Sequence, residues 1–442
     1  MRRLLDASAA LLAALLLPLA VAGAEEPYWR QQVIDLAARV RALEAGFEDG
    51  SGGVPRWLTR FHLAGNATFA YRQGDRHSPA PSGDLTADDT RLFLDTDLVS
   101  DLRLGERPLL GDASFYVEWQ AVAEQAVENR VGSLYLRLDG VFGVDALNAK
   151  IGRVLLPYGE EYVRFAEQRA ANPLLGFSAA APYGRDQGLL FFGGTPGRSL
   201  QYVAGVLSGD TGFAVDLAHQ AELAAKLIWE PTGWAHLSLS GLGTGPLGSR
   251  REPGAATLEL GETHVTPFGS GTDVPSFRNG APVADDPAGK LSMNAGEADM
   301  ILNASDWGRL WLAGGRVAIR SGGASTYDRD LTYGTAEGIL GLGAFSHALE
   351  RLYVAARYSA IGTFDRNEGY LLDAGNGGDE LGFNTRRVTV ASLGAGIRVT
   401  SFLTLKSEYS WYDFVLVRGV TPDVRAEAGG RNFFGVGVTV AF

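Results

Sequence analysis

Lysine and arginine side chains recur on one face of segments whose other face is apolar. From Leu352 to Tyr358 every second residue is apolar, which leaves Arg351 and Arg357 on the opposite face. The same alternation assigns a set of basic residues to polar faces: Arg72, Arg137, Lys150, Lys226, Arg316, Arg320, Arg351, Arg357, Arg398 and Lys406. Arginine and lysine around a water-filled passage attract anions through their field and their hydrogen bonds. We therefore expect these residues to line a pore.

Acidic residues share those faces, so the expected lining is mixed with a slight basic surplus. They are Asp95, Asp97, Glu118, Glu222, Glu297, Asp299 and Glu408. The alternative for each basic residue is an ion pair with a carboxylate on a neighbouring segment. For Arg316 and Arg320 the assignment rests on Trp311 and Val317, whose odd parity predicts an apolar, lipid-facing side.

A second group of charges lies in the long connection 155–185. It consists of Glu160, Glu161, Arg164, Glu167, Arg169 and Arg185, with no lysine between Leu155 and Arg185. A loop of about thirty residues in a compact protein has a function or is disordered. Its middle, residues 173–177, is apolar and small, which is unfavourable in water. We therefore expect a constriction loop folded into the interior, with packing between subunits as the alternative.

The polar and apolar faces require strands to position them. From Phe434 to Phe442 every even residue is apolar and every odd residue is small or polar, which is the period of a strand. A terminal aromatic residue after such a strand is typical of β-barrels of the bacterial outer membrane. These residues are therefore predicted to form the closing strand of a barrel.

Alternation divides residues 60–442 into about sixteen segments, an even number as in bacterial barrels. The predicted strands begin near Phe61, Asp89, Asp112, Arg130, Ala146, Asp186, Arg198, Asp216, Gly233, Ala295, Gly308, Tyr333, Leu349, Arg386, Phe402 and Arg431. Short turns alternate with long loops, as they do when the short turns face the periplasm. The sequence thus predicts an all-β fold, a transmembrane antiparallel barrel whose first and last strands pair.

Residues 1–24 predict a secretory signal peptide. Arg2 and Arg3 precede an apolar run, and residues 22–24 form a small-x-small cleavage site. The run is shorter than the roughly 20 residues that a membrane-spanning helix needs.

Residues 25–47 predict a short coiled-coil helix in the periplasm, followed by a linker at 48–59. The apolar residues of this helix are spaced by four and three, which is a heptad seam: Trp29, Val33, Leu36, Val40 and Leu43. Such a narrow stripe needs a partner. The helix either packs on or in the barrel or joins copies of the chain, most naturally three.

The composition excludes several classes of function. The chain has 442 residues, no cysteine and a formal net charge of -12, which becomes -13 when Arg2 and Arg3 leave together with Asp6. Absence of cysteine excludes disulfides, thiolate metal sites and covalently attached c-type haem. The acidic balance makes nucleic acid an unfavourable partner.

No catalytic or cofactor site is predicted. The six histidines are dispersed without metal-ligand spacing, and the glycine-rich stretch after Gly241 ends a strand instead of opening a helix. We therefore expect no enzyme and no cofactor. Two alternatives remain, a hydrolase embedded in the barrel and a barrel that sheathes a partner such as an electron-transfer protein.

The start of the long connection resembles a known signature. Gly152, Arg153, Pro157, Tyr158, Gly159 and Glu161, followed by Phe165 and Glu167, resemble the G-[KR]-x3-P-[FY]-G-x-E…F-x-E-[KR] pattern of the phosphate-selective porin O and P family. Gly184, Arg185, Asp186, Gly188 and Gly193 resemble the G-R-[DN]-x-G-x4-G pattern of the same family.

This resemblance implies a homotrimer of barrels, each with a water-filled pore that an inward-folded third loop narrows. Phosphate preference in that family rests on an arginine ladder and constriction lysines, and the missing loop lysines depart from this pattern. We therefore expect a porin in the outer membrane of a Gram-negative bacterium, surrounded by lipid and assembled by the barrel-assembly machinery. It would pass small hydrophilic solutes with a modest anion preference, phosphate being one candidate.

Overall fold

A computed structural model describes residues 60–75, 83–123, 127–161, 172–176, 178–180, 182, 184–195, 197, 199–208, 222–244, 291–304, 307–321, 329–364, 384–429 and 431–441. The predicted signal peptide (1–24), coiled-coil helix (25–47) and linker (48–59) lie outside these residues, as do Arg164, Glu167 and Arg169. No helix in the described part of the chain is long and apolar enough to cross a membrane.

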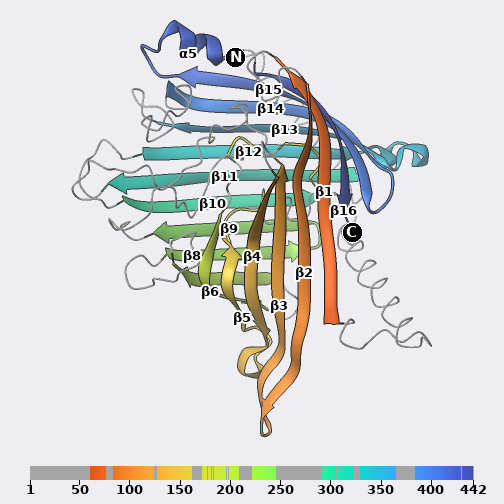
Figure 1. Ribbon diagram of the computed structural model, residues 1–442, viewed down its shortest axis with the longest axis vertical. Coiled ribbons are helices and arrows are strands. Elements are labelled where there is room, and N and C mark those ends of the chain that lie inside the picture. Colours follow the sequence, from red (N-terminus) through yellow and green to blue (C-terminus); the bar gives the residue numbers. More distant parts are fainter. Residues whose placement is uncertain are drawn as a thin grey trace.

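Sixteen antiparallel strands form a closed barrel in which each strand pairs with its neighbours in sequence (Figure 1). The strands are β1 (Phe61–Gly74), β2 (Asp84–Leu104), β3 (Arg107–Ala123), β4 (Val127–Asp139), β5 (Asn148–Leu155), β6 (Arg185–Gly194), β7 (Leu200–Leu207), β8 (Glu222–Thr232), β9 (Ala235–Thr244), β10 (Leu291–Asn303), β11 (Gly308–Ser321), β12 (Arg329–Gly341), β13 (Leu352–Thr363), β14 (Thr385–Arg398), β15 (Leu403–Leu416) and β16 (Phe433–Ala441). The predicted sixteen-stranded barrel is thereby confirmed.

The barrel closes where the sequence predicts. β16 pairs with β1 from Phe433 opposite Gly74 to Ala441 opposite Asn66. Along β16 the even residues are the more exposed ones and the odd residues are buried until the strand end. The apolar even positions of the closing strand therefore face outward, and its small odd positions face the interior.

Connections differ between the two ends of the barrel, as expected. At the short-turn end only Gly105 and Glu106 separate β2 from β3, and only residues 233–234 separate β8 from β9. At the same end, the β4–β5 turn contains the 3-10 helix η3 (Val141–Gly143), and the β12–β13 turn contains η8 (Leu342–Ala344) and η9 (His347–Leu349). The opposite, long-loop end includes the connections 156–184, 245–290 and 364–384 and the helix α5 (Pro422–Glu427).

The β2–β3 hairpin extends beyond its neighbours at the short-turn end (Figure 1). β1 stops pairing with β2 at Thr96, and β4 stops pairing with β3 at Asp112, whereas β2 and β3 continue to Leu104 and Arg107. The sequence predicts a start of β3 near Asp112 because the alternation is weak before it. Local hairpin pairing needs no such alternation, so the strand begins earlier.

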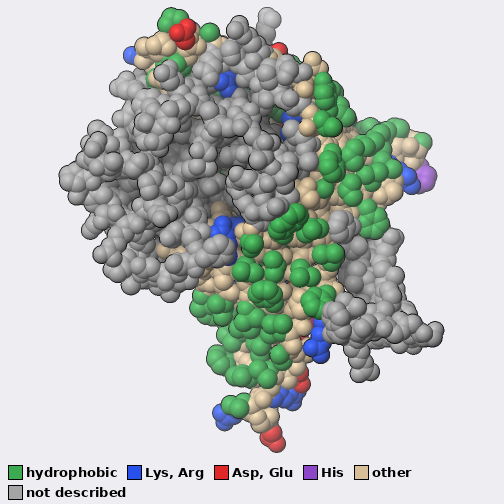
Figure 2. Space-filling model, in the orientation of Figure 1, with side chains coloured by type: hydrophobic (Ala, Val, Ile, Leu, Met, Phe, Trp, Pro, Cys, Tyr) green, Lys and Arg blue, Asp and Glu red, His purple; other side chains and the backbone are tan. Residues whose placement is uncertain are grey.

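The outer face of the wall is apolar. Figure 2 shows hydrophobic side chains gathered over the wall made by β1 to β4. Exposed examples from outward positions are Phe69, Leu227, Leu239, Leu393 and Val436. An apolar band around a closed barrel suits a hydrocarbon environment, because neighbouring strands satisfy one another's backbone groups.

Candidate functional site

The connection between β5 and β6, residues 156–184 and hereafter the inner loop, has its described parts inside the barrel. The backbone N of Gly159 donates to Ser240 Oγ at 3.0 Å, and the N of Ala179 donates to Ser359 Oγ at 2.9 Å. Ser240 belongs to β9 and Ser359 to β13, and both are buried. The inner loop leaves β5 and reaches inward-facing side chains on distant strands, so it crosses the interior.

One carboxylate of β15 holds the middle of the inner loop. The backbone N atoms of Leu175 and Gly176 donate to Glu408 Oε2 at 2.7 and 2.8 Å. On β13, the hydroxyl of Tyr353 donates to the carbonyl O of Pro173 at 3.0 Å. Hydrogen bonds to an ionised carboxylate are roughly twice as strong as neutral ones. The apolar middle of the loop is therefore fixed by its backbone.

Glycines on the inner wall let the loop approach. A Cβ on Gly435 or Gly437 would lie 2.9 or 2.7 Å from side-chain atoms of Leu175, and a Cβ on Gly394 would lie 2.5 Å from Leu174. Real Cβ atoms essentially never come closer than 3.0 Å to such neighbours. The small odd positions of the closing strand thus make room for the leucines of the inner loop.

Glu160 fastens the first part of the inner loop to β8 and β9. Lys226 Nζ lies 2.8 Å from Glu160 Oε1 and also donates to the carbonyl O of Gly159. His236 Nε2 lies 2.8 Å from the same Glu160 oxygen, and His236 Nδ1 lies 2.9 Å from Glu230 Oε1. Lys226, Glu160 and His236 are all buried. Lys226 is therefore part of an ion-paired anchor.

Arg357 fastens the second part. Its Nη1 donates to the carbonyl O of Gly176 at 2.7 Å, and its Nη2 donates to Asn172 Oδ1 at 3.2 Å. The same guanidinium binds Glu337, which also accepts from Arg309 Nη2 at 2.7 Å. A buried pair of this kind is strongly destabilised when one partner is removed. Arg357 thus links the loop to the wall, and Glu337 neutralises its charge.

Glu161 turns toward its own loop. Its carboxylate accepts bonds from the backbone N and the hydroxyl of Ser178. Burial raises the pKa of Glu161 to about 7, although the nearby Arg357 and the Ser178 bonds act in the opposite direction. Near neutral pH this buried carboxyl is therefore partly protonated.

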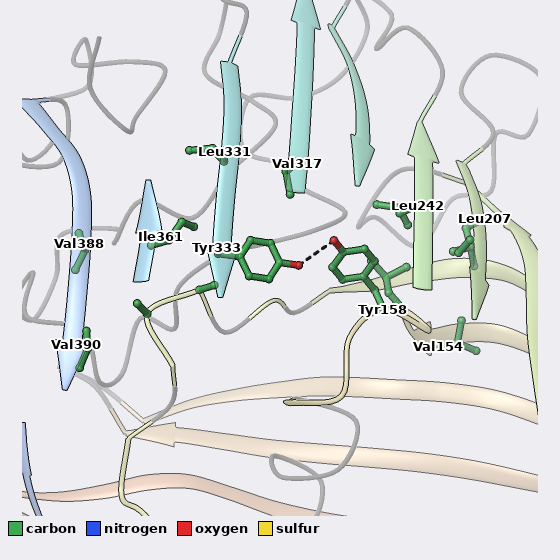
Figure 3. Close-up of a cluster of buried hydrophobic side chains, with 14 of the residues drawn as sticks. Val154, Tyr158, Leu207, Leu242, Val317, Leu331, Tyr333, Ile361, Val388 and Val390 are labelled. Atoms are coloured by element: carbon green, nitrogen blue, oxygen red, sulfur yellow. Dashed lines mark hydrogen bonds between the residues drawn. The ribbon is translucent and has the colours of Figure 1, made fainter. Parts of the chain in front are cut away.

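Aromatic and aliphatic side chains surround the start of the loop. The Tyr158 hydroxyl lies 2.9 Å from the Tyr333 hydroxyl of β12 (Figure 3). Tyr333 also donates to Glu297 of β10. Burial is the main cause that raises the pKa of Tyr158, with the nearby carboxylate of Glu297 adding to it. The buried cluster around the pair includes Val154, Leu207, Leu242, Val317, Leu331, Ile361, Val388 and Val390. The inner wall at this level is therefore apolar as well as charged.

Arg185, predicted as part of the constriction loop, is the first residue of β6. Its Nη2 lies 2.8 and 2.9 Å from the two oxygens of Glu118 on β3, and Arg91 Nη1 lies 3.3 Å from the same carboxylate. Ser133 and Gln120 donate to Glu118 as well. All are buried, so Arg185 closes a structural cluster on the β2–β6 wall.

The structure places most predicted pore residues on inward faces. Arg72, Lys226, Arg357 and Lys406 are inward and buried, whereas Arg137, Lys150 and Arg398 are inward and partly exposed. The strands that carry them have a clearly apolar outer face, which makes their parity readable from the sequence.

Arg316 and Arg351 require correction. On β11 it is Trp311 and Val317 that are buried inside, whereas the side chain of Arg316 is 62% exposed and pairs with Asp330 at 3.1 Å on the outer face. Trp311 donates to Asp299 of β10 at 3.1 Å, which places its side chain inside the barrel. The apolar residues of β11 that the sequence assigns to the outer face therefore belong to the inner face.

Arg351 lies in the turn before β13, not in the strand. It is exposed and donates from Nη1 to the carbonyl O of Val399 at 3.2 Å. Arg320 belongs to β11, and its side chain lies outside the described residues.

Three anchoring residues, His236, Arg309 and Glu337, are absent from the sequence-based prediction. The sequence gives one indication of their position, the alternation along each strand. Arg309 lies on the same face as Trp311, and the sequence assigns that face to the wrong side of the barrel. Their partners lie far away in sequence, as in the 76-residue separation of His236 and Glu160. Only the folded barrel brings them together.

The short-turn half of the β2–β6 wall carries cations against aromatic rings. Lys150 Nζ lies 4.6 Å from the ring centroid of Tyr135 and 5.7 Å from that of Phe192. Arg137 Cζ lies 5.4 Å from the Phe192 centroid, and the Arg137 side chain is 43% exposed. On the opposite side, Arg398 Cζ lies 5.2 Å from the ring centroid of Tyr353.

The signature residues have local structural roles. Gly152 has φ +135°, and a Cβ there would lie 2.3 Å from the carbonyl O of Leu134. Gly159 has φ +65° and faces Glu297, while Arg153 Nε donates to the carbonyl O of Gly132 at 2.9 Å. Pro157 precedes Tyr158 in the turn where the chain leaves the wall. The signature thus shapes the entry of the inner loop.

No family model matches the chain, and no curated protein matches it. Solved structures do. The outer membrane channel DcaP of Acinetobacter baumannii has a TM-score of 0.53 at 13% identity, with 86% of this chain and 97% of that chain covered. OprB of Pseudomonas putida has a TM-score of 0.51 at 12% identity, with 89% and 100% covered.

The anion-selective porin from Comamonas acidovorans has a TM-score of 0.50 at 14% identity, with 86% and 99% covered. These likenesses extend to the fold and not to the narrower phosphate-selective family. The chain has the fold of a porin-type β-barrel.

Proposed function

We propose that this chain is an outer-membrane porin that passes small hydrophilic solutes by passive diffusion with a modest preference for anions. The observation that carries the proposal is a closed barrel with an apolar outer face, a charged inner face and its own loop across the interior. A loop anchored inside a barrel narrows the passage, and this constriction needs no conformational change.

The anion preference is supported by the inward cations that remain partly exposed, Arg137, Lys150 and Arg398. Solutes can reach these side chains, whereas Lys226 and Arg357 are buried against carboxylates. Arg137 also binds Asp139 at 2.8 Å, which moderates the local field. Phosphate is one solute of this class, and the neighbouring porin of Comamonas acidovorans is described as anion-selective.

The location follows from the same architecture. We propose that residues 1–24 direct export and are removed, that the coiled-coil helix 25–47 and the short turns face the periplasm, and that the barrel-assembly machinery recognises the closing strand. Lipid of the outer membrane then surrounds the apolar band.

A homotrimer is the proposed assembly. The heptad seam of residues 25–47 supports it, because such a stripe needs partner helices. Among the similar structures, OmpT of Vibrio cholerae is described in a trimer form, with a TM-score of 0.51 at 10% identity over 86% of this chain and 99% of that chain.

Single-channel recording in planar bilayers tests the proposal. The purified protein should give ohmic steps in KCl, and the reversal potential in a KCl gradient should indicate a modest chloride preference. Absence of conductance would contradict the porin function, and a cation-selective reversal potential would contradict the anion preference alone.

A matched pair of variants locates the preference. Lys150→Gln removes a partly exposed inward charge and should move the reversal potential toward the cation side. Arg316→Gln removes the same charge from the outer face and should leave it unchanged. Equal shifts in both variants would mean that general surface charge sets the selectivity.

A further inference from the structure

The inner face of β2 to β6 carries a continuous row of four aromatic rings and one lysine ammonium. Phe93 and Tyr116 have ring centroids 6.3 Å apart at 28°, and Tyr116 and Tyr135 have centroids 4.7 Å apart at 18°. Lys150 follows over the Tyr135 ring, and Phe192 lies beyond Lys150. Each of these five residues comes from a different neighbouring strand, so the row runs around the wall.

The row lies on the path between the short-turn end and the inner loop. Phe192 is near the end of β6, and Lys150 is near the start of β5, well before the inner loop leaves that strand. All five side chains of the row are partly exposed. A solute that diffuses between this mouth and the loop therefore passes them.

The Lys150 ammonium is held in place by the two aromatic rings beside it. The Lys150 ammonium lies 4.6 Å from one ring centroid and 5.7 Å from the next, within the range of cation–π attraction. Arg137 stands beside it over Phe192 and is also bound to Asp139, and Asp95 lies opposite Tyr116 in the register. These carboxylates limit the net charge, so the row discriminates by local geometry more than by its field.

The stacked rings add a second kind of contact. Because neighbouring rings cover one another's faces, they present edges and, for the tyrosines, hydroxyls to the interior. Ring edges carry partial positive charge and attract the face of another ring, with a gain of roughly 0.5–1.5 kcal/mol beyond area burial. A flat ring with an attached carboxylate can therefore meet ring edges and a fixed ammonium together.

We propose that this row is a docking strip for small carboxylates carried on an aromatic ring, an inference that rests on the proposed porin function. Inorganic anions meet only its cations, and aliphatic carboxylates gain no edge-to-face contact. The strip therefore selects by ring character among anions of similar size.

Conductance in potassium benzoate and in potassium cyclohexanecarboxylate provides the test, because the two anions have similar size and charge and only one has an aromatic ring. Wild-type conductance should saturate with rising salt concentration, and the half-saturating concentration should be roughly two- to tenfold lower for benzoate. Equal half-saturating concentrations would overturn the docking strip while leaving the porin function intact. Absence of any conductance, in KCl as well, would instead overturn the porin function.

Two variants separate the ring from the charge. Tyr135→Leu should bring the ratio of the two half-saturating concentrations close to one. Lys150→Gln should raise both concentrations while the ratio stays above one. An unchanged ratio in Tyr135→Leu would contradict the proposal.

The matched control is Tyr409→Leu, which removes a tyrosine ring from the outer face, where its centroid lies 4.5 Å from that of Trp411 in a tilted pair. This variant should reproduce the wild-type ratio. A loss of the ratio in Tyr409→Leu equal to that in Tyr135→Leu would show that general destabilisation causes it and would also overturn the strip.

Discussion

The barrel holds its inward-facing cations in two different settings. At the level of the inner loop, Lys226 and Arg357 are buried and bind carboxylates as well as loop carbonyls. Toward the short-turn end, Lys150 and Arg398 lie over tyrosine rings and are partly exposed. An inward position therefore does not make a cation part of the solute path. Burial and the identity of the partner decide between an anchor and a lining residue.

The largest expected effect comes from breaking an anchor. Arg357→Met removes two bonds to the inner loop and leaves Glu337 with Arg309 alone, so the free energy of unfolding should fall by about 3–5 kcal/mol. Urea titration of the barrel folded into lipid vesicles measures this change. The double variant Arg357→Met with Glu337→Gln should be less destabilised, because the buried carboxylate is also gone. If the double variant loses more than the single one, the pair is not the source of the effect.

A smaller effect is expected where the loop touches the closing strand. Gly437→Ala places a Cβ 2.7 Å from Leu175 of the loop and 2.9 Å from the backbone O of Phe69 in the wall, so we expect a loss of about 1–3 kcal/mol in stability. The contact with Leu175 should also move the loop away and give a larger single-channel conductance. Gly334→Ala is the control, since its Cβ would meet its nearest neighbour, the carbonyl O of Ala313, at 3.5 Å. A conductance equal to wild type in Gly437→Ala would contradict the proposed constriction.

The proton on Glu161 should make the inner loop sensitive to pH. Its pKa is raised to about 7 in the folded barrel, so the folded state favours the protonated carboxyl. The resulting stabilisation is fully present below the ordinary carboxyl pKa. That contribution is lost as the pH rises through about 7, where the buried carboxyl ionises. Conductance should therefore become noisier between pH 6 and pH 8, a window of about one unit on either side of this pKa.

Glu161→Gln keeps a neutral side chain at this position at any pH, so its conductance noise should not change over the same window. A pH response equal to wild type in this variant would assign the effect to another group.

The smallest effect is expected at the corrected position Arg351. Arg351→Gln removes one hydrogen bond in an exposed turn, so its stability should stay within about 0.5 kcal/mol of wild type. Its reversal potential in a KCl gradient should not move. A clear shift would return Arg351 to the pore lining that its sequence parity predicts.

Strand positions and faces can be predicted from the sequence where the outer face of the barrel is apolar. On β13 and β16 the outward residues are apolar or small, and the inward ones are small or polar apart from Ile361 and Phe433, so alternation gives both the strand and its parity. The pairing of β1 with β16 then follows from closure.

The same reasoning failed on β11 because its inner face carries apolar side chains, which pack against neighbouring strands at Trp311 and in a cluster with inner-loop residues at Val317. Trp311 and Val317 satisfy the pattern expected of lipid-facing residues while they are buried inside. Alternation shows which residues of a strand share a face, but it does not show whether that face is the inner or the outer one. An apolar inner face depends on contacts between residues that lie far apart in the sequence. The bond from Leu175 to Glu408 spans 233 residues and leaves no local signal.

Reversal potentials of Lys150→Gln and Lys226→Gln, recorded in the same KCl gradient, test the division into anchors and lining residues most directly. Both variants remove one inward charge from the same barrel. We predict that Lys150→Gln moves the reversal potential toward the cation side and that Lys226→Gln leaves it at the wild-type value while lowering the stability of the barrel. A larger shift in Lys226→Gln than in Lys150→Gln would contradict this division.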